Sequence, residues 1–481
     1  MLSRVLALGF VVTFVLATSV AAQQIVMLPV GSWANDVTPD GSVVVGTYPG
    51  GGFIWHWQQD PAPTIVPGGD MVAVSDDGTV VAGTIIDPTV NAEVAAIWTQ
   101  ATGWQSLGWL PNALSCPSRS TAYDISGDGT TVVGLSWDGC DGRGFRWTAA
   151  TGMQELQKLA NGHNRCSAIS GDGSALGGFA QGSFSRTPAY WSPNLTGAVL
   201  DPNLQGEVYG FSEDGTLSVG TLYQDTTQNY YDAFVRNNVT GAITNIGSVH
   251  VDWASAATDL SGDATVVVGF DYISLARQAW VWTSSDGIQS LNDRLTALGV
   301  TGAPPLLVCT AVSDNGNIVV GAGQVAPGPF GFGGFIVQLS NLVPYGAATA
   351  GCTGRPVLSG SPAPHVNTPS FALSCTKAPP LSVGLWVITD VADDAGSDPF
   401  GIGAKLYVDL FTATLLLTVN GTSDASGLGT APAPIPNNAA IAGATVYAQA
   451  LWAWPAGSCT TNYPLPFGLS ASNGLAITIL P

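Results

Sequence analysis

The amino-acid sequence predicts an all-β protein whose main body is a seven-bladed β-propeller with four antiparallel strands in each blade. Three observations support this prediction: a repeat that recurs seven times, a glycine at the same turn of nearly every copy, and an aromatic residue in the third strand of nearly every copy. The composition agrees, because 60 glycines, 15 tryptophans and only 10% charged residues are typical of a folded β protein with many tight turns.

The repeat is clearest in residues 122–134, which read Ala-Tyr-Asp-Ile-Ser-Gly-Asp-Gly-Thr-Thr-Val-Val-Gly and precede Gly-Phe-Arg-Trp at 144–147. The alternation of apolar and polar residues predicts the first strand, and Asp-Gly predicts a tight turn after it. The valines predict the second strand, and Phe-x-Trp predicts the third. A further turn leads to a fourth strand, as in 104–107, 153–156 and 288–291. Matching copies begin at residues 34, 71, 166, 208, 257 and 309, a spacing close to the ~40–50 residues of propeller repeats.

The last copy ends after its third strand, at residues 335–339, and so lacks a fourth. Residues 24–28, Gln-Ile-Val-Met-Leu, resemble the missing strand. We therefore expect the N-terminal strand to complete blade seven and to close the ring, which also removes an exposed sheet edge. The alternative is that this strand packs elsewhere.

The pattern Asp-(Ile/Val)-Ser-x-Asp-Gly-x-Val-Val-Gly…Phe-x-Trp resembles the HAF extracellular repeat of secreted bacterial proteins, over about residues 30–340. The resemblance implies a fold and a location, and no reaction. Some copies depart from the pattern, which predicts weaker single blades. The departures are Ala73, Ala168, Gly210 and Ala311 at the first Asp, Ala264 at the turn Gly, and Val337 at the Trp.

Residues 1–22 read as a signal peptide, with Arg4 at the start, an apolar stretch at 5–16 and Val20-Ala-Ala22 at the cleavage site. A transmembrane anchor is the alternative, but the apolar stretch is shorter than the ~20 residues of a span. We expect a secreted protein, extracellular or associated with the cell surface, with the periplasm as an alternative location. It should have no membrane span after cleavage and should be a monomer.

Export makes disulfides possible. Because the chain has seven cysteines, an odd number, at least one of them cannot pair within the chain. Cys116 and Cys140 flank the first hairpin of one repeat and are the first expected pair. A second pair is expected among Cys352, Cys375 and Cys459, with Cys352 and Cys459 as the candidates. Without a Cys-x-x-Cys spacing and with only four histidines, neither a zinc site nor a cofactor is expected.

The charge excludes one class of partner. With 33 acidic and 13 basic residues the formal net charge is −20, so the chain lacks the basic stripe of a nucleic-acid-binding protein. An anionic membrane surface would repel it for the same reason.

A composition rich in Pro, Ala, Ser and Thr marks a second domain at residues 343–481, after the propeller of residues 23–342. Strand patterns at 370–375, 382–389, 405–408, 414–419, 444–452 and 475–480 predict a small β-sandwich. Its opening Tyr345-Gly…Gly-Cys352 and closing Ser472-Asn-Gly-Leu475 resemble a C-terminal module of planctomycete-type secreted proteins, which has no assigned activity. It could attach the protein to a surface, or bind carbohydrate on exposed Trp452 and Trp454. The favoured interpretation places both tryptophans in the core.

In each predicted blade the loops between strands two and three share a face with the connections between blades. These loops vary in length and content, so this variable-loop face is the candidate binding face. Aromatic residues mixed with carboxylates can bind sugars, and they can also bind peptides or calcium. The alternative is that these loops are ordinary solvated loops without a ligand. The candidate binding residues are Trp137, Asp138, Asp141, Arg143, His163, Tyr223, Asp225, Tyr231, Asp232, Asp271 and Tyr272.

The repeated turn carboxylates do not predict a metal site, because turn chemistry already accounts for an aspartate at that place. They are Asp40, Asp77, Asp128, Asp172, Asp214 and Asp263.

The sequence favours a non-catalytic extracellular scaffold or binding protein, for a polysaccharide or a cell-surface partner. It contains no Gly-x-Ser-x-Gly, His-Glu-x-x-His or phosphate-loop motif. The alternative is a hydrolase or lyase that acts on glycans, because propellers host both classes. Carboxyl groups that converge in the central pocket with raised pKa values would favour the enzyme, whereas a wide polar channel with an aromatic rim would favour binding.

Overall fold

The computed structural model describes residues 25–111, 119–137, 140–183, 185–223, 230–262, 264–298, 300–328, 330–346, 348–349, 351, 354–361, 364–401, 403–454 and 468–479. The expected signal peptide, residues 1–22, lies outside them. One compact unit comprises Gln24–Ser340, and a second includes Asn341–Pro481. Among the described residues, no helix has the length and apolar character needed to cross a membrane.

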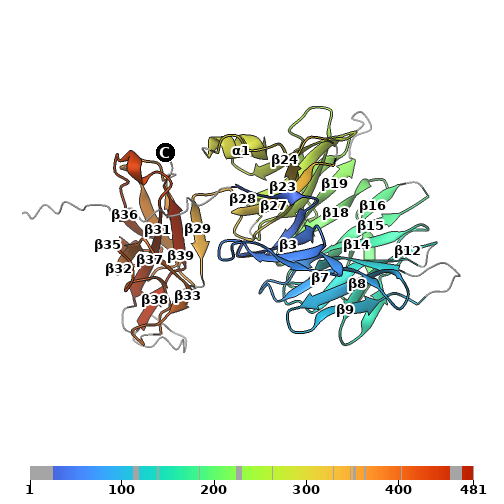
Figure 1. The fold of residues 1–481 in the computed structure, drawn as a ribbon, viewed down its shortest axis with the longest axis horizontal. Coiled ribbons are helices and arrows are strands. Elements are labelled where there is room, and N and C mark those ends of the chain that lie inside the picture. The colour runs from blue at the N-terminus through green and yellow to red at the C-terminus, as the bar shows by residue number, and fades with distance from the viewer. Residues whose placement is uncertain are drawn as a thin grey trace, which may run out of the picture. The chain divides into compact units, whose positions relative to one another are not determined.

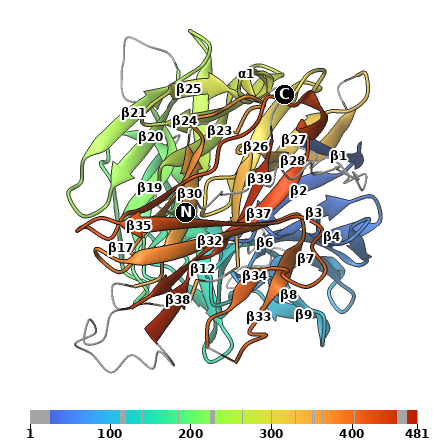
Figure 2. The same ribbon diagram turned by 90° about the vertical axis from the view of Figure 1, so that its left-hand side faces the viewer.

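Antiparallel sheets of four strands build the first unit, and the described residues form seven of them (Figures 1 and 2). In sheets 1 to 6, numbered in chain order, the four strands follow one another along the chain. Sheet 1 has β2 (Trp33–Val37), β3 (Val43–Tyr48), β4 (Gly51–His56) and β5 (Thr64–Val66). Sheet 2 has β6 (Gly69–Val74), β7 (Val80–Asp87), β8 (Ala92–Thr99) and β9 (Gly103–Gly108). Sheet 3 has β10 (Arg119–Ile125), β11 (Thr131–Trp137), β12 (Gly142–Thr148) and β13 (Gly152–Glu155).

The remaining sheets repeat this order. Sheet 4 has β14 (Asn164–Ile169), β15 (Leu176–Gln181), β16 (Arg186–Trp191) and β17 (Gly197–Val199). Sheet 5 has β18 (Gln205–Phe211), β19 (Leu217–Tyr223), β20 (Asp232–Asn237) and β21 (Ile243–Gly247). Sheet 6 has β22 (Ala254–Leu260), β23 (Val266–Ile273), β24 (Ala276–Thr283) and β25 (Gly287–Ser290), and a short helix, α1 (Leu291–Ala297), follows it. Sheet 7 has β26 (Leu306–Val312), β27 (Ile318–Gln324), β28 (Phe332–Gln338) and β1 (Ile25–Val30).

The N-terminal strand completes the last sheet, as the sequence predicted. Strand β1 pairs antiparallel with β28, with Ile25 opposite Val337 and Met27 opposite Phe335. The sheets also follow one another in a circle, because the first strand of each sheet contacts the first strand of the next, and β2 of sheet 1 contacts β26 and β27 of sheet 7. In Figure 1 the blue strands from the start of the unit accordingly lie beside the yellow and orange strands from its end.

The Asp-Gly turns have the local chemistry expected from the repeat. In sheet 3, Asp128 accepts hydrogen bonds from Ser126 Oγ at 2.6 Å and from the Thr130 backbone N–H at 2.9 Å. Gly129 has φ +70°, a left-handed conformation that glycine adopts without a steric cost. Ala264 must adopt φ +53° at the same place in sheet 6. The turn carboxylates therefore stabilise hairpins.

A second aspartate of the repeat joins neighbouring sheets. Every first strand has a register shift at the same repeat position, for example between Ala34 and Asp36. The Asp36 carboxyl group accepts the backbone N–H of Val37 in its own strand and that of Val74 in sheet 2, both at 2.8 Å. We call such a residue an inter-sheet aspartate.

Sheets 3 and 6 contain the other two inter-sheet aspartates. Asp124 accepts the N–H groups of Ile125 and of Ile169 in sheet 4, both at 2.8 Å. Asp259 accepts the N–H of Val312 in sheet 7 at 2.8 Å. Sheets 2, 4 and 7 lack this aspartate and receive their acceptor from the preceding sheet, while the weakening of single blades stays a prediction. Sheet 5, with Gly210, has no such aspartate and follows a sheet that also lacks one.

The second unit is also built from antiparallel strands. A nine-stranded sheet has the order β29-β39-β37-β32-β35-β36-β31-β30, with β38 paired to β37, and a separate ribbon joins β33 to β34. The bounds are β29 (Leu342–Tyr345), β30 (Val357–Ser361), β31 (Ala372–Thr376), β32 (Val383–Thr389), β33 (Ala392–Ser397), β34 (Leu406–Val408), β35 (Leu416–Ser423), β36 (Gly429–Pro432), β37 (Thr445–Ala453), β38 (Leu469–Ala471) and β39 (Gly474–Thr478), with a 3-10 turn η1 at Ala439–Ile441.

The core of this unit contains the tryptophans that could have formed a sugar platform. Trp452 is fully buried and Trp454 is 8% exposed, and the ring of Trp452 packs edge-on against Trp386 with 4.9 Å between centroids. The interpretation that places them in the core is confirmed, and the exposed platform is wrong. The end strands β29 and β30 contact each other, so the strands surround this core.

The described residues include only some of the cysteines expected to form disulfides. Cys140 is disulfide-bonded, while Cys116, Cys352 and Cys459 lie outside the described residues, so their pairing stays a prediction. Cys166, Cys309 and Cys375 are buried free thiols. Burial raises the pKa of Cys375 to about 11, so this thiol is unreactive at neutral pH.

Removal of an inter-sheet aspartate should destabilise the first unit. Asp124→Ala leaves two buried N–H groups, on Ile125 and Ile169, without their acceptor, at a cost of about 1–3 kcal/mol each. Asp128→Ala, in the exposed turn of the same sheet, is the matched control and should cost less. Urea denaturation of both variants measures the difference, and an equal or smaller loss for Asp124→Ala would contradict the role assigned to it.

The same carboxyl groups should make stability depend on pH. Burial raises the pKa of Asp36 to about 6 and of Asp124 to about 8. The folded state therefore holds protons that the unfolded state releases above about pH 4, and the free energy of unfolding should fall as pH rises from 4 to 8, by about 1.4 kcal/mol per pH unit for each group between its two pKa values. Urea midpoints at pH 5 and pH 8 test this; a midpoint that rises with pH would contradict it. Asp36→Asn should reduce the slope.

Candidate functional site

Two faces of the first unit differ in their connections. The Asp-Gly turns after each first strand, together with the turns between third and fourth strands, lie on one face, which we call the turn face. The loops between second and third strands and the connections between sheets lie on the opposite, variable-loop face. The predicted binding residues come from these loops and from the strand ends beside them.

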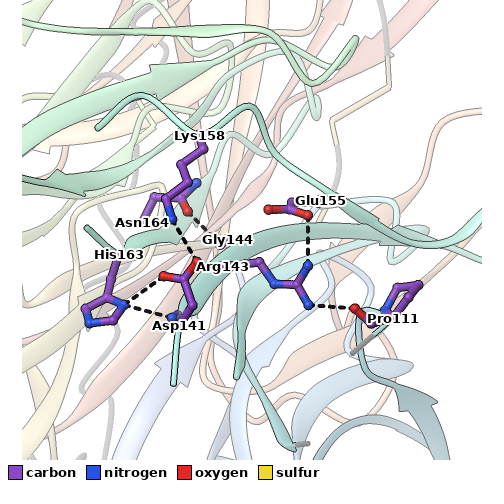
Figure 3. Close-up of polar contacts among 9 residues, drawn as sticks. Pro111, Asp141, Arg143, Gly144, Glu155, Lys158, His163 and Asn164 are labelled. Carbon is purple, nitrogen blue, oxygen red and sulfur yellow. Dashed lines mark hydrogen bonds and ion pairs between the residues drawn. The ribbon is translucent and has the colours of Figure 1, made fainter. Parts of the chain in front are cut away.

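Three of the predicted residues come together at the edge between sheets 3 and 4. The rings of Trp137 and His163 lie 5.2 Å apart, and the Asp141 carboxylate is 2.7 Å from Lys158 Nζ and 3.2 Å from His163 Nδ1 (Figure 3). The Gly142 backbone N–H donates to the same Nδ1 at 2.8 Å. The His163 Nδ1 atom therefore lies between the Gly142 N–H and the Asp141 carboxylate.

Arg143 belongs to a separate pair. Its guanidinium donates to Glu155 at 3.1 Å and to the Pro111 carbonyl at 2.8 Å, and Figure 3 shows this pair apart from Asp141 and His163. Asp138 and Asp225 lie outside the described residues, so their place in a site stays a prediction.

A second group forms in sheets 5 and 6. The rings of Tyr223 and Tyr231 lie 5.5 Å apart, and the Tyr231 hydroxyl contacts Gln205 Oε1 at 3.2 Å. Tyr272 packs against Phe270 with 5.7 Å between centroids. Burial, and then the neighbouring Tyr231, raise the pKa of Tyr272.

Asp271 is not available to a ligand at the surface, in contrast to the expectation from its loop-like context. It is fully buried, and its Oδ2 accepts hydrogen bonds from Ser248 Oγ at 2.7 Å and from the His250 backbone N–H at 3.0 Å. This carboxyl group thus holds the connection between sheets 5 and 6 in place.

That connection forms the wall of a cavity of about 560 Å³ on the variable-loop face. The rings of His250 and Trp253 pack in a tilted arrangement with 4.4 Å between centroids, and Asp232 accepts a hydrogen bond from Asn245 at 2.8 Å. We call this cavity the sheet 5–6 pocket. It is lined by Tyr230, Asp232, Asn245, Ile246, Gly247, Ser248, His250, Val251, Asp252 and Trp253. Aromatic faces beside a carboxylate, an amide and a hydroxyl can stack on a sugar ring and bind its hydroxyl groups.

Sequence reasoning placed Asp232 among the binding residues but missed His250, Trp253 and Asn245. A signal was present, because residues 248–253 read Ser-Val-His-Val-Asp-Trp and follow strand β21 in a connection between repeats. The aromatic and polar content of that connection is comparable to that of the loops that were chosen.

A smaller cavity of about 190 Å³ lies at the centre of the unit, lined by the first strands. The three inter-sheet aspartates line it, together with Asp76, Glu213 and Asp314 from the Asp-Gly turns. Burial and then the nearby Asp76 and Asp314 raise the pKa of Glu213 to about 7. Among the described residues, no group of three or more His, Cys, Asp or Glu side chains is arranged to hold a metal ion.

Comparison with known proteins gives similarity only at the level of structure. No protein-family model and no curated protein matches the sequence. TolB from Acinetobacter baumannii is 11% identical, with a TM-score of 0.35, over 53% of this chain and 60% of TolB. Oligogalacturonate lyase from Vibrio parahaemolyticus is 13% identical, with a TM-score of 0.42, over 66% of this chain and 92% of the lyase. The β-propeller domain of the Trilobed protease from Pyrococcus furiosus is 10% identical, with a TM-score of 0.41, over 60% of this chain and 91% of that domain.

Proposed function

We propose that this chain is a secreted, non-catalytic binding protein that holds an extracellular polysaccharide or a cell-surface partner on its variable-loop face. The sheet 5–6 pocket is the observation that carries the proposal. It combines the packed rings of His250 and Trp253 with the polar side chains of Asp232 and Asn245, and it lies on the face whose loops differ most from repeat to repeat.

The proposal includes a seven-bladed propeller of HAF-type repeats at residues 23–342, followed by a β-sandwich module at 343–481. The circle of sheets and the pairing of β1 with β28 support the propeller. The module's closed core, around Trp386 and Trp452, supports an independent folding unit.

The second candidate is an enzyme that hydrolyses or eliminates glycans, with its carboxyl groups in the central cavity. The raised pKa values of Asp36, Asp124 and Glu213 favour it, since a general acid needs its proton near neutral pH. Two of these groups, however, already accept backbone N–H groups through both oxygens. A reaction that used them would have to break the contacts between sheets.

Loss of the Trp253 ring should weaken ligand binding. Trp253→Ala removes the ring that packs on His250, and we expect about two- to tenfold lower affinity for a glycan found on an array, from an aromatic contribution of about 0.5–1.5 kcal/mol. Trp57→Ala, on the turn face, is the matched control and should leave binding unchanged. Titration by calorimetry measures both, and equal losses in the two variants would argue against the pocket.

The enzyme alternative has its own test. Glu213→Gln removes a carboxyl group of the central cavity whose pKa is raised to about 7. We expect unchanged glycan affinity, with no new reducing ends or unsaturated products from either protein. A measurable turnover by the unmodified chain that Glu213→Gln abolishes would replace the binding proposal with the enzyme.

A further inference from the structure

Basic side chains are rare in this acidic chain and are concentrated in one place. Of the 13 Lys and Arg residues, six lie within residues 119–186. One of them, Arg146, lies inside strand β12, and the other five lie at strand ends or in a connection of sheets 3 and 4. They are Arg119, Arg143, Lys158, Arg165 and Arg186, which we call the basic cluster.

The fold brings these five residues to the variable-loop face. First and third strands of every sheet begin there, and four of the arginines are the first or second residue of such a strand: Arg119 in β10, Arg143 in β12, Arg165 in β14 and Arg186 in β16. Lys158 lies in the connection between sheets 3 and 4.

The acids near the cluster do not neutralise it. Asp141 pairs with Lys158 at 2.7 Å and Glu155 with Arg143 at 3.1 Å. Glu207, which is almost fully buried, serves both Arg165 and Arg186. Five basic and three acidic residues leave two positive charges among the described residues here, in a chain whose formal net charge is −20.

Two of the cations remain accessible beside aromatic surfaces. The Arg186 side chain is 51% exposed, and its guanidinium is 3.3 Å from the Glu207 carboxylate. The same guanidinium lies over the Phe179 ring, 4.2 Å from its centroid. Exposed Arg119 lies over Trp137 at 5.8 Å. A guanidinium fixed over a ring offers its remaining donors to a carboxylate in a planar, bidentate geometry.

We propose that the basic cluster is a subsite for a glycan that carries carboxylate groups, a polyuronate. The proposal rests on the proposed function and names the ligand class for the same face. The arginines bind the carboxylates, while Trp137 and His163, whose rings are 5.2 Å apart, provide the stacking surface for the sugar rings. The turn face carries Asp76, Glu213 and the turn aspartates, whose negative charge disfavours the same ligand there.

The test is a binding titration of the full chain with alginate at low and at physiological salt. We expect binding that weakens with salt and a loss of about tenfold in the double variant Arg119→Gln/Arg186→Gln. Arg294→Gln is the matched control and should bind as the unmodified chain does. Arg294 lies on α1 and forms an ion pair with Asp286, so the variant also removes one cation. Neutral dextran should bind more weakly than alginate.

The outcomes separate the two proposals. Absence of alginate binding, or an equal loss with Arg294→Gln, overturns the subsite. Competition by poly-L-glutamate as strong as that by alginate shows a site for any polyanion and overturns the choice of a glycan. If the double variant loses alginate and Trp253→Ala keeps it, the basic cluster stands and the sheet 5–6 pocket falls. If only Trp253→Ala loses it, the pocket stands and the cluster falls.

Discussion

The first unit depends on how its sheets are joined at their inner ends. Each first strand shifts register at the same position, and a shift of this kind leaves backbone donors outside the ladder. A buried donor without an acceptor is costly, and Asp36, Asp124 and Asp259 supply acceptors across the boundaries between sheets 1 and 2, 3 and 4, and 6 and 7. The circle is therefore joined by specific hydrogen bonds in addition to apolar packing between sheets.

This arrangement explains a feature of the repeat that looks like degeneration. One aspartate has two oxygens and satisfies two strands, so a copy next to it needs none. The aspartates join the sheets in pairs, and seven sheets cannot all be paired. Sheet 5, which has Gly210 at this position, is the sheet without a paired neighbour. Burial raises the pKa of all three carboxyl groups, and their hydrogen bonds satisfy N–H groups that would otherwise be unpaired. The central cavity is polar for this structural reason, which weakens the argument that its carboxyl groups perform chemistry.

Much of the first unit could be predicted because its information is local. Asp-Gly turns, alternating strands and the unmatched strand at residues 24–28 are visible without knowing what packs against them. Counting strands shows that residues 24–28 complete the last sheet, whereas the register of Ile25 opposite Val337 comes from the structure. The nine-stranded sheet was harder. Strands β30, β33 and β36 are short, lack clear alternation and depend on their neighbours for hydrogen bonds, so no local pattern marked them. The buried Trp452 was anticipated because large apolar side chains favour the core.

In the candidate site, too, some features could be predicted from the sequence and others could not. The face on which a loop lies follows from the order of strands, so the sequence could indicate where to look. Whether a loop residue points to solvent depends on what crosses behind it, and Asp271 was misjudged because the connection at 248–250 turns back over its carboxyl group. His250 and Trp253 were missed for the related reason that their pocket forms only when sheets 5 and 6 meet.

The strand that closes sheet 7 makes the order of synthesis important. Ile25 leaves the ribosome more than 300 residues before Val337 can meet it, so throughout that interval strand β1 lacks the strand with which it pairs in the folded chain. A premature partner, such as the β28 edge of another copy, would compete for β1. Mechanical load on the N-terminus would likewise fall first on these few ladder bonds, and the circle would open there before any other sheet came apart.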